Sequence, residues 1–400
     1  MGKRFTIYCL VTCPYVFPRG KSLRVHAGLQ ALLALGHRIT VFTYANGSDF
    51  SHAGLEIRRT PYLFRMRRPG QVGPCLSKIF SDSCLYRLAY QAMKDRPCDL
   101  LLATDIEGAI LATLLKRSFS VPVLMDIHGI FSELLTNTTR LKSRAVATVC
   151  NAIERWAWSS ADLLLCNWPR VRAYARKILP DVASCTLLDI PPESVQKIIG
   201  QPFPATSLAR EWQERLNGRK VLLYTGNFSG YNHFSLALEG FSLALKNGLE
   251  RVIFLVVGGG DQRAQQRAVE LNLGDNVFFL GRRSPEEAMD MTRLSDVCLS
   301  MTTGQGNTPS KILYYFLAGK PVILCDSKPH RSFVPEETDA LYCANRAEDL
   351  AAKLILIFKS HKLRRNLSEA VLRKSREYTV QATRDQWQQI LQTLLVGSPK

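Results

Sequence analysis

The 400-residue sequence is short of acidic side chains, since 34 Asp and Glu oppose 52 Lys and Arg and leave a formal net charge of +18. It contains no uninterrupted run of about 18 apolar residues, the length that a membrane-spanning helix needs. None of its 11 cysteines belongs to a CxxC pair, and no cluster of metal ligands has a useful spacing. These absences argue against a transmembrane protein, a disulfide framework and a structural metal site. We therefore expect a cytoplasmic protein with reduced, buried thiols.

The basic excess is concentrated near the start of the chain. Residues 1–100 hold 15 basic and 5 acidic side chains, a balance of 15 − 5 = +10. A basic surface attracts nucleic acid, anionic lipid headgroups or phosphorylated substrates, and net charge alone does not separate these partners. No nucleic-acid recognition motif accompanies the charge, so we expect no nucleic-acid partner.

Short apolar runs alternate with helical patterns along most of the chain, in a composition that is 46% hydrophobic and 22% charged. In the first half this alternation predicts strands and helices at 5–11, 22–35, 38–44, 100–103, 108–116, 121–125, 142–158, 163–166 and 170–177. In the second half it predicts them at 220–224, 233–246, 251–257, 261–271, 277–280, 285–294, 296–300, 309–318 and 321–324. Repeated strand–helix–strand units indicate parallel sheets that are covered by helices on both faces.

A proline-rich stretch of weak periodicity separates the two series. We therefore expect an N-terminal Rossmann-like domain over 1–190, a connection over 191–218 and a second Rossmann-like domain over 219–378. The last segment, 379–400, is predicted to be a helix that packs back on the N-terminal domain. The predicted fold class is α/β, with two doubly wound domains that face a cleft.

The loop after the first predicted strand carries glycine and positive charge. In open parallel sheets a ligand sits at the carboxyl ends of the strands, so such loops are candidate sites. Gly20 permits a close approach of the backbone, and Arg19, Lys21 and Arg24 add charge that suits a phosphate at a helix N-terminus. A solvent-exposed basic loop explains the same residues equally well.

Two acids and a histidine follow later strands of the same series. Asp105 and Glu107 either bind substrate hydroxyls or cap the helix that follows them. His128 lies in the sequence Asp126-Ile127-His128-Gly129, directly after the strand at 121–125. It is either a polar group of the site or a structural histidine that is bonded to its own loop.

The second series has glycine-rich loops and one informative helix start. Gly226-Asn227-Phe228 and Gly258-Gly259-Gly260 each follow a strand, where glycine serves either a ligand or a tight turn. Further on, Thr308 is an expected N-cap and Pro309 falls at the first helical position. Lys311 in the first turn opposes the helix dipole, which is understandable if an anion binds at the same end.

The segment around Lys311 resembles the donor-binding helix of retaining GT-B glycosyltransferases of the family 4 group, whose pattern is P-x-K-x-x-E-Y-x-A-x-G-x-P-V. The matching residues are Pro309, Lys311, Tyr315, Gly319, Pro321 and Val322. Gly20, the loop after 220–224 and the His128 segment fall where that group has its other motifs. The resemblance covers nearly the whole chain and implies the GT-B architecture.

The resemblance implies transfer of a sugar from a nucleotide diphosphate sugar to a glycan or lipid-linked hydroxyl, with retention, in cell-surface polysaccharide or glycolipid synthesis. It implies no cofactor and no metal, because helix dipoles and basic side chains stabilise the leaving diphosphate. The implied catalytic residues are His128 and Lys311. The implied donor-binding residues are Gly20, Asn227, Arg282, Gly306, Asn307, Thr308 and Tyr314. The expected acceptor-side residues are Asp105, Glu107, Arg65, Arg67 and Arg68.

The sequence departs from the family pattern at the donor site. Tyr314 stands where the family has the acid that holds the donor ribose, and Asn307 stands where it has a second acid. Asn227 stands near the position of a basic residue. Either this is a branch that uses these residues in place of the acids, or it is a degenerate protein that binds nucleotide sugar or a partner without transfer.

A run of arginines without an acid lies in the first series, at positions 58, 59, 65, 67 and 68. One interpretation is a solvent-exposed arginine face. The other is docking on the anionic inner leaflet of a membrane, where each basic residue near the surface contributes about 1 kcal/mol. We expect the second arrangement to bring the protein to a lipid-linked acceptor at the cytoplasmic membrane face.

Overall fold

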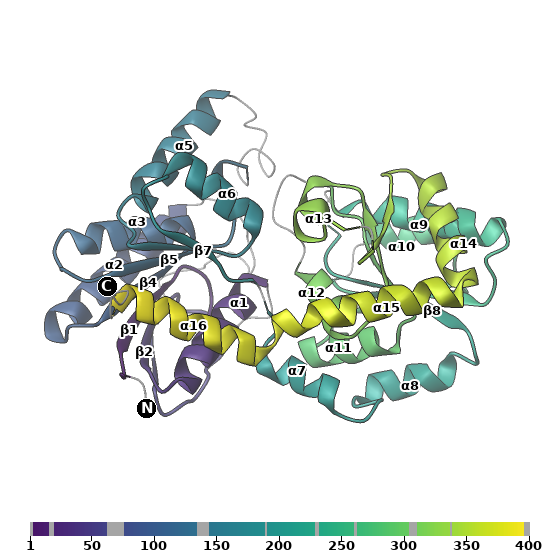
Figure 1. The fold of residues 1–400 in the computed structure, drawn as a ribbon, viewed down its shortest axis with the longest axis horizontal. Helices are drawn as coiled ribbons and strands as arrows, with labels where there is room; N and C mark the ends of the chain where they lie inside the picture. The colour runs from purple at the N-terminus through teal and green to yellow at the C-terminus, as the bar shows by residue number, and fades with distance from the viewer. Residues whose placement is uncertain are drawn as a thin grey trace. The chain divides into compact units, whose positions relative to one another are not determined.

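The structure is a computed structural model that describes residues 3–15, 20–61, 76–133, 144–188, 190–228, 232–259, 262–303, 310–336 and 338–395. The chain divides into two compact units (Figure 1). Unit 1 comprises Met1–Asp189 and Val380–Lys400, and unit 2 comprises Ile190–Thr379. Each unit has its own parallel sheet and its own hydrophobic core.

Unit 1 is built on a seven-stranded parallel sheet in the order β3-β2-β1-β4-β5-β6-β7. Its strands are β1 Thr6–Val11, β2 Arg38–Thr43, β3 Leu55–Arg59, β4 Leu100–Thr104, β5 Val123–Ile127, β6 Leu163–Cys166 and β7 Ser184–Thr186. Every residue of β4 and β5 is buried. These central strands are covered on both faces, which explains why their sequences are continuous apolar runs without alternation.

The helices of unit 1 are α1 Gly20–Ala34, α2 Leu76–Asp95, α3 Asp105–Lys116, α5 Arg144–Trp158, α6 Pro169–Ile178 and α16 Val380–Leu395. Helix α16 comes from the end of the chain but packs beside α1 (Figure 1). Its Trp387 is buried, and a Cβ at Gly28 of α1 would lie 3.4 Å from the indole ring. The sequence analysis did not predict α2 or the edge strand β3.

Unit 2 is built on a six-stranded sheet in the order β10-β9-β8-β11-β12-β13. Its strands are β8 Lys220–Thr225, β9 Val252–Val257, β10 Val277–Gly281, β11 Val297–Ser300, β12 Val322–Cys325 and β13 Leu341–Cys343. Its helices are α7 Glu193–Gly200, α8 Ser207–Arg215, α9 Phe234–Lys246, α10 Gln262–Glu270, α11 Pro285–Leu294, α12 Lys311–Leu317, α13 Lys328–Phe333, α14 Ala347–Lys359, α15 His361–Ser375 and the 3-10 helix η2 Arg376–Tyr378.

The stretch that the sequence analysis took as a connection, 191–218, contains α7 and α8 and belongs to unit 2. Both helices pack against α11. The carboxylate of Asp290 in α11 is fully buried and accepts hydrogen bonds from the backbone amides of Ala205 and Thr206, at 2.8 and 2.7 Å. The prolines that interrupt the helical periodicity concealed these helices from the sequence analysis.

Both sheets are parallel and doubly wound, so the predicted fold class is confirmed. The strand order reverses between β1 and β4 in unit 1 and between β8 and β11 in unit 2. At such a reversal, the loops that follow the two neighbouring strands run in opposite directions and leave a crevice. In open sheets, ligands bind in this crevice at the carboxyl ends of the strands. None of the described helices has both the length and the apolar composition needed to cross a bilayer.

Candidate active site

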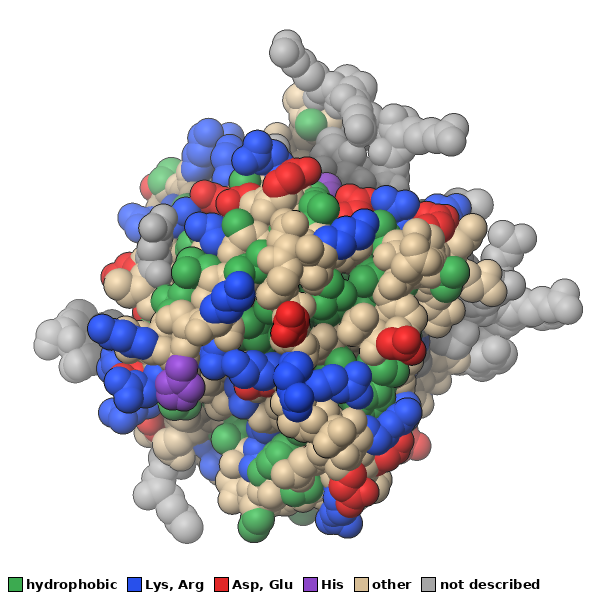
Figure 2. Space-filling model, turned by 90° about the vertical axis from the view of Figure 1, so that its right-hand side faces the viewer, with side chains coloured by type: hydrophobic (Ala, Val, Ile, Leu, Met, Phe, Trp, Pro, Cys, Tyr) green, Lys and Arg blue, Asp and Glu red, His purple; other side chains and the backbone are tan. Residues whose placement is uncertain are grey.

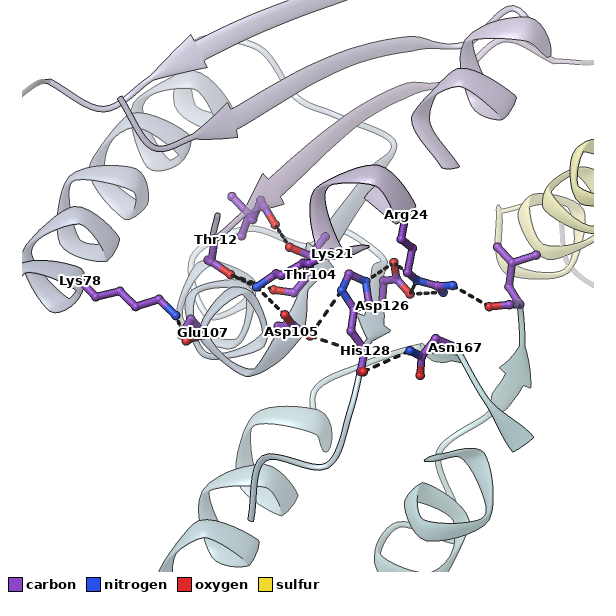
Figure 3. A network of polar contacts seen from close by, with 12 residues as sticks. Thr12, Lys21, Arg24, Lys78, Thr104, Asp105, Glu107, Asp126, His128 and Asn167 are labelled. Atoms are coloured by element: carbon purple, nitrogen blue, oxygen red, sulfur yellow. Dashed lines mark hydrogen bonds and ion pairs between the residues drawn. The ribbon is translucent and has the colours of Figure 1, made fainter. Parts of the chain in front are cut away.

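The reversal point of unit 1 carries an ion pair between the first turns of α1 and α3. Lys21 of α1 pairs with Asp105 of α3, and its ammonium also lies 3.5 Å from the hydroxyl of Thr12, just after β1 (Figure 3). Thr12 in turn donates to the carbonyl of Thr104 at 3.2 Å. The loops that follow β1 and β4 are therefore joined by a chain of polar contacts at the place where the topology predicts a site.

Asp105 has an unusual backbone conformation, with φ of +60°. A non-glycine residue in this left-handed region costs about 1 kcal/mol or more and persists where its surroundings require it. Here the turn directs the carboxylate back toward the sheet edge, where one oxygen accepts from the backbone amide of His128 at 3.2 Å. Asp105 thus bonds to the loop after β5 instead of simply capping α3, whose N-cap position is Thr104.

His128 is buried and faces a carboxylate on each side of its ring. Its Nε2 lies 2.7 Å from Asp126 Oδ2, and its Nδ1 lies 3.6 Å from Asp105 Oδ1 (Figure 3). Its carbonyl accepts from the amide of Asn167, just after β6, at 3.1 Å. The loop and the ring are therefore both held by bonds within unit 1, and a role of His128 toward a substrate stays a prediction.

Arg24 supports this arrangement from α1. Its guanidinium contacts both oxygens of Asp126, at 2.6 Å from Nη2 and 3.2 Å from Nε, and donates to the carbonyl of Leu187 at 2.8 Å. Both side chains are more than nine-tenths buried. Lys21 and Arg24, which the sequence offered as charges for a phosphate, are therefore each neutralised by an aspartate of unit 1.

The charges of this cluster reinforce one another. Burial lowers the pKa of His128, but the carboxylates of Asp126 and Asp105 outweigh it and raise that pKa above its ordinary value. Burial raises the pKa of Asp105, yet Lys21 and His128 bring it down to about 2. Asp126 likewise has a lowered pKa because Arg24 and His128 outweigh its burial. The two aspartates are thus ionised, and the charged form of His128 is favoured.

The remaining acceptor-side candidates are structurally engaged or lie outside the described residues. Glu107 forms an ion pair with Lys78 of α2. Arg58 pairs with Glu56 at 2.7 Å, and Arg59 donates to the carbonyl of Ser48 and to Asp49 at 2.7 and 3.0 Å. Two of the five arginines are therefore bound within unit 1. Arg65, Arg67 and Arg68 lie outside the described residues, as does Arg19.

The reversal point of unit 2 carries a cation without a carboxylate. The ammonium of Lys311 lies 4.0 Å from the centre of the Tyr224 ring, and a Cβ at Gly226 would come within 3.4 Å of it. Among the residues that the structure describes, no acid pairs with Lys311. Burial lowers the pKa of this lysine to about 7. A buried ammonium that lacks a counter-ion is suited to receive an anion.

Tyr315 fixes the helix that carries Lys311. Its hydroxyl accepts from the backbone amide of Thr225 at 3.0 Å and donates to the carbonyl of Leu299 at 3.4 Å, so α12 is anchored to both β8 and β11. Tyr314, the residue in place of the family acid, is half-buried on the same helix. The predicted cap, Thr308, lies outside the described residues with Gly306, Asn307 and Pro309, and α12 is described from Lys311 onward.

The loops after β8 and β11 are joined by an amide and hydroxyl network that the sequence analysis missed. Asn232 donates to the side-chain oxygen of Asn227 at 2.8 Å and accepts from the hydroxyl of Thr302 at 2.8 Å. His233, which has a left-handed backbone, contacts the hydroxyl of Thr303. The side chain of Asn227 is therefore bonded within unit 2.

The first glycine after β9, Gly258, is explained by close packing of the backbone. A Cβ at Gly258 would lie 1.8 Å from the carbonyl oxygen of Gly226, so only glycine fits between these two loops. The next residue, Gly259, packs on Arg282, whose Nε lies 3.2 Å from the position of a Cβ. Arg282 is exposed, and no described residue forms a hydrogen bond or an ion pair with it. Its guanidinium is available at the rim of the unit 2 loops.

The fold of the whole chain matches solved GT-B structures. A sucrose-phosphate synthase from Thermosynechococcus elongatus superposes with a TM-score of 0.77 at 18% identity, over 99% of this chain and 100% of the other. HepE from Anabaena in complex with UDP and glucose gives 0.73 at 14%, over 98% and 100%. An α,α-trehalose-phosphate synthase (UDP-forming) from Burkholderia vietnamiensis gives 0.72 at 14%, over 98% and 100%. The molecule is of the GT-B class.

Family models match both parts of the chain. The model described as glycosyl transferases group 1 matches residues 209–374, and the glycosyl transferase 4-like domain matches residues 20–187. The chain belongs to the group 1 glycosyltransferases. The resemblance that the sequence motifs indicated is thereby confirmed at the level of family and enzyme class. Comparison with curated protein sequences finds no match.

Proposed function

We propose that this glycosyltransferase moves a sugar from a nucleotide diphosphate sugar to a hydroxyl of a glycan or lipid-linked acceptor, with retention of anomeric configuration. The observation that carries the proposal is Lys311, a cation without a described counter-ion at the reversal point of unit 2. A donor diphosphate supplies the missing negative charge, and the charge that develops on it as the sugar leaves strengthens the same contact. The UDP and glucose in HepE of Anabaena support a donor of this kind.

Apart from Gly20 of unit 1, the donor residues that we assign lie in unit 2. Lys311 binds the diphosphate, Arg282 flanks the base, and Asn227 belongs to the loop that the donor approaches. Gly306, Asn307, Thr308 and Tyr314 complete the assignment. The acceptor hydroxyl attacks on the face that the diphosphate leaves, and the diphosphate takes its proton, so that no protein nucleophile is required.

The assignment for unit 1 is an acceptor-side role. His128 contacts the transferring sugar, and Asp105 and Glu107 order the acceptor hydroxyls. Gly20 begins α1, a 15-residue helix whose first amides suit a phosphate group. No metal is part of the proposal, because lysine, arginine and backbone amides provide the positive charge that the leaving group needs.

We also propose that the acceptor is held at an anionic membrane surface on the cytoplasmic side, in glycolipid or cell-surface polysaccharide synthesis. The net charge of +18 supports this. The basic excess of residues 1–100 belongs to unit 1, and Figure 2, which faces unit 2, shows a further band of lysine and arginine side chains there. Binding to vesicles that contain an anionic phospholipid, lost at high salt, is the expected result. Equal binding to neutral and anionic vesicles would refute the proposal.

The test of the donor proposal is a panel of nucleotide sugars with different bases and sugars. Release of nucleoside diphosphate in the presence of glycan and lipid-linked acceptors is the expected result. The anomeric proton of the product, observed by NMR, reports retention directly. No binding of any nucleotide sugar would overturn the proposal.

A second candidate is a degenerate protein that binds nucleotide sugar without transfer. Tyr314 and Asn307 favour it, because they remove the two acids that the family pattern has at the donor site. The same panel separates the candidates, since binding without turnover in the presence of acceptors would favour this one.

A further inference from the structure

His128 and the two aspartates beside it form a unit with a defined charge state. We propose that Asp126 is a positioning residue which, together with Asp105, holds His128 as a doubly protonated imidazolium with one fixed ring orientation. This inference rests on the proposed function for its catalytic consequence, but its structural content can be measured without any turnover. In this state His128 is a fixed cation at the site and does not exchange a proton.

First, the geometry around the His128 ring indicates where its hydrogens lie. Ionised carboxylates only accept hydrogen bonds, so the 2.7 Å contact between Asp126 Oδ2 and His128 Nε2 requires a hydrogen on Nε2. Asp105 Oδ1 faces the other nitrogen, Nδ1, at 3.6 Å. A neutral imidazole would present a lone pair to one of these two carboxylates. The imidazolium donates to Asp126, and its charge attracts Asp105 at 3.6 Å, a distance longer than a hydrogen bond.

The second step is the set of charges around the pair of carboxylates. Arg24 of α1 holds Asp126, at 2.6 Å from its Nη2, and Lys21 of the same helix pairs with Asp105. Both cations favour the ionised form of the carboxylate that they touch. From the side of β6, Asn167 contributes an uncharged amide that bonds to the His128 carbonyl. The ring therefore faces two anions that are themselves held in place.

The third step is the balance of charge. Lys21, Arg24 and the imidazolium give +3 against −2 from the two aspartates, which leaves +1 for the cluster. With a neutral imidazole the same cluster would be uncharged. An imidazolium cannot accept a proton from an acceptor hydroxyl, so His128 acts in sugar transfer as an oriented positive charge. The raised pKa of His128 agrees with this state.

The direct test is the titration of His128, followed by NMR on protein with isotope-labelled histidine and assigned with the His128→Gln variant. In the wild type, the ring should titrate above the ordinary histidine pKa of about 6.5. The Asp126→Asn variant keeps the shape of the side chain and should lower the midpoint by about one pH unit. Asp49→Asn, which removes an exposed carboxylate of unit 1, should leave it unchanged.

A second variant covers the other carboxylate. Asp105→Asn suits the backbone φ of +60°, because asparagine tolerates the left-handed region. It should also lower the midpoint, by less than Asp126→Asn, since Asp105 lies farther from the ring. If the wild-type ring titrates below about 6.5, or if both variants leave its midpoint unchanged, the proposal is overturned. The wild-type titration alone decides the matter if a variant does not fold.

The catalytic consequence is tested by the pH dependence of kcat and KM. At pH 8 the Asp126→Asn variant should have a kcat below that of the wild type, by at most about tenfold, with KM changed less than twofold. The difference should shrink at pH 6, where the ring of the variant regains its proton. A loss that is equal at both pH values would reduce Asp126 to a structural role. If the His128 midpoint shifts in the two variants as expected but the wild type shows no turnover, the result would count against the proposed function alone.

Discussion

The two reversal points have the same strand topology but differ in whether their basic side chains are paired with carboxylates. In unit 1 every cation of the cluster faces an aspartate: Lys21 pairs with Asp105, and Arg24 with Asp126. In unit 2 the lysine at the reversal point is Lys311, on the helix that follows β11, and it lies on the ring of Tyr224 with no acid beside it among the described residues. A carboxylate therefore neutralises the charge of Lys21, whereas the aromatic face of Tyr224 only partly stabilises the charge of Lys311.

This difference explains why the pKa values of the two lysines are shifted in opposite directions. The pKa of Lys21 is raised, since Asp105 outweighs the effect of burial. The pKa of Lys311 is lowered to about 7, because burial acts on it alone. Unit 1 holds its own counter-ions and keeps its arrangement without a ligand. In unit 2 the charge of Lys311 can be neutralised by a bound ligand. This is the difference expected between a preorganised surface and a binding site.

The largest expected effect is on the stability of unit 1. Asp126→Ala leaves Arg24 buried without its partner, and removal of one member of a buried ion pair costs about 3–5 kcal/mol. Urea unfolding, followed by tryptophan fluorescence, measures the loss. The lowered pKa of Asp126 fixes the sign of the pH dependence: its contribution is present above the unfolded pKa and is lost as pH falls through the folded value.

The control for this prediction is Asp49→Ala. Asp49 pairs with Arg59 at the surface, so its removal should cost less than about 0.5 kcal/mol. Equal losses for the two variants would mean that the buried network of unit 1 is no stronger than a surface ion pair, and the comparison between the units would fail.

The next effect is on ligand affinity in unit 2. Lys311→Ala should weaken the binding of a nucleoside diphosphate about 100-fold, since a buried charged contact of this kind is worth about 2–5 kcal/mol. The stability of the unliganded protein should not fall, because the variant removes a desolvated cation. Calorimetric titration with UDP and thermal unfolding give the two values. Lys328→Ala, at an exposed lysine of the same unit, is the matched control.

An unchanged affinity in Lys311→Ala would remove the observation on which the proposed donor site depends. A large loss of stability would show instead that the contact with Tyr224 holds the unit 2 loops together. Either result would make the two reversal points alike, and the contrast between them would not explain the function.

Much of the fold could be predicted because buried parallel strands are continuous apolar runs. Strands such as β4, β5 and β9 are recognisable without knowledge of their neighbours. The edge strand β3 has the sequence Leu-Glu-Ile-Arg-Arg and lacks such a run, so it was missed. Helices α7 and α8 were missed since the prolines around them suggest a linker, although tertiary contacts with α11 hold them in unit 2.

The sequence indicated which residues follow a strand, but not which residues pair with one another in the candidate site. Asp105, His128 and Lys311 were identified because each follows a strand, and strand ends are visible in sequence. Arg24 and Asp126 are 102 positions apart, so their pairing depends on the neighbouring positions of α1 and β5 in the fold. The sequence could not show that Lys21 is neutralised and Lys311 is not. A charged residue in a loop can be recognised in the sequence, whereas the residue that pairs with it cannot.

A smaller effect is the pH dependence of donor binding. The pKa of Lys311 is about 7 in the unliganded protein, and a diphosphate binds its ammonium form. The dissociation constant for UDP should therefore be constant below about pH 6 and rise by up to about tenfold per pH unit above pH 7. Calorimetric titration from pH 6 to 9 measures it. A flat profile would indicate that Lys311 stays charged, as Lys21 does, and would remove the difference between the two lysines.

The smallest effect compares the hydrogen bonds that join the strands at the two reversal points. Tyr315→Phe removes the acceptor of the Thr225 amide, and Thr104→Ala removes a 3.0 Å bond to the carbonyl of Leu10. Each should cost about 0.5–1.5 kcal/mol of unfolding free energy. Only Tyr315→Phe should also weaken UDP binding, by a few-fold, because Tyr315 anchors the helix that carries Lys311. If both variants weaken binding equally, the donor contact does not depend on unit 2 alone, and the two reversal points act on the ligand together.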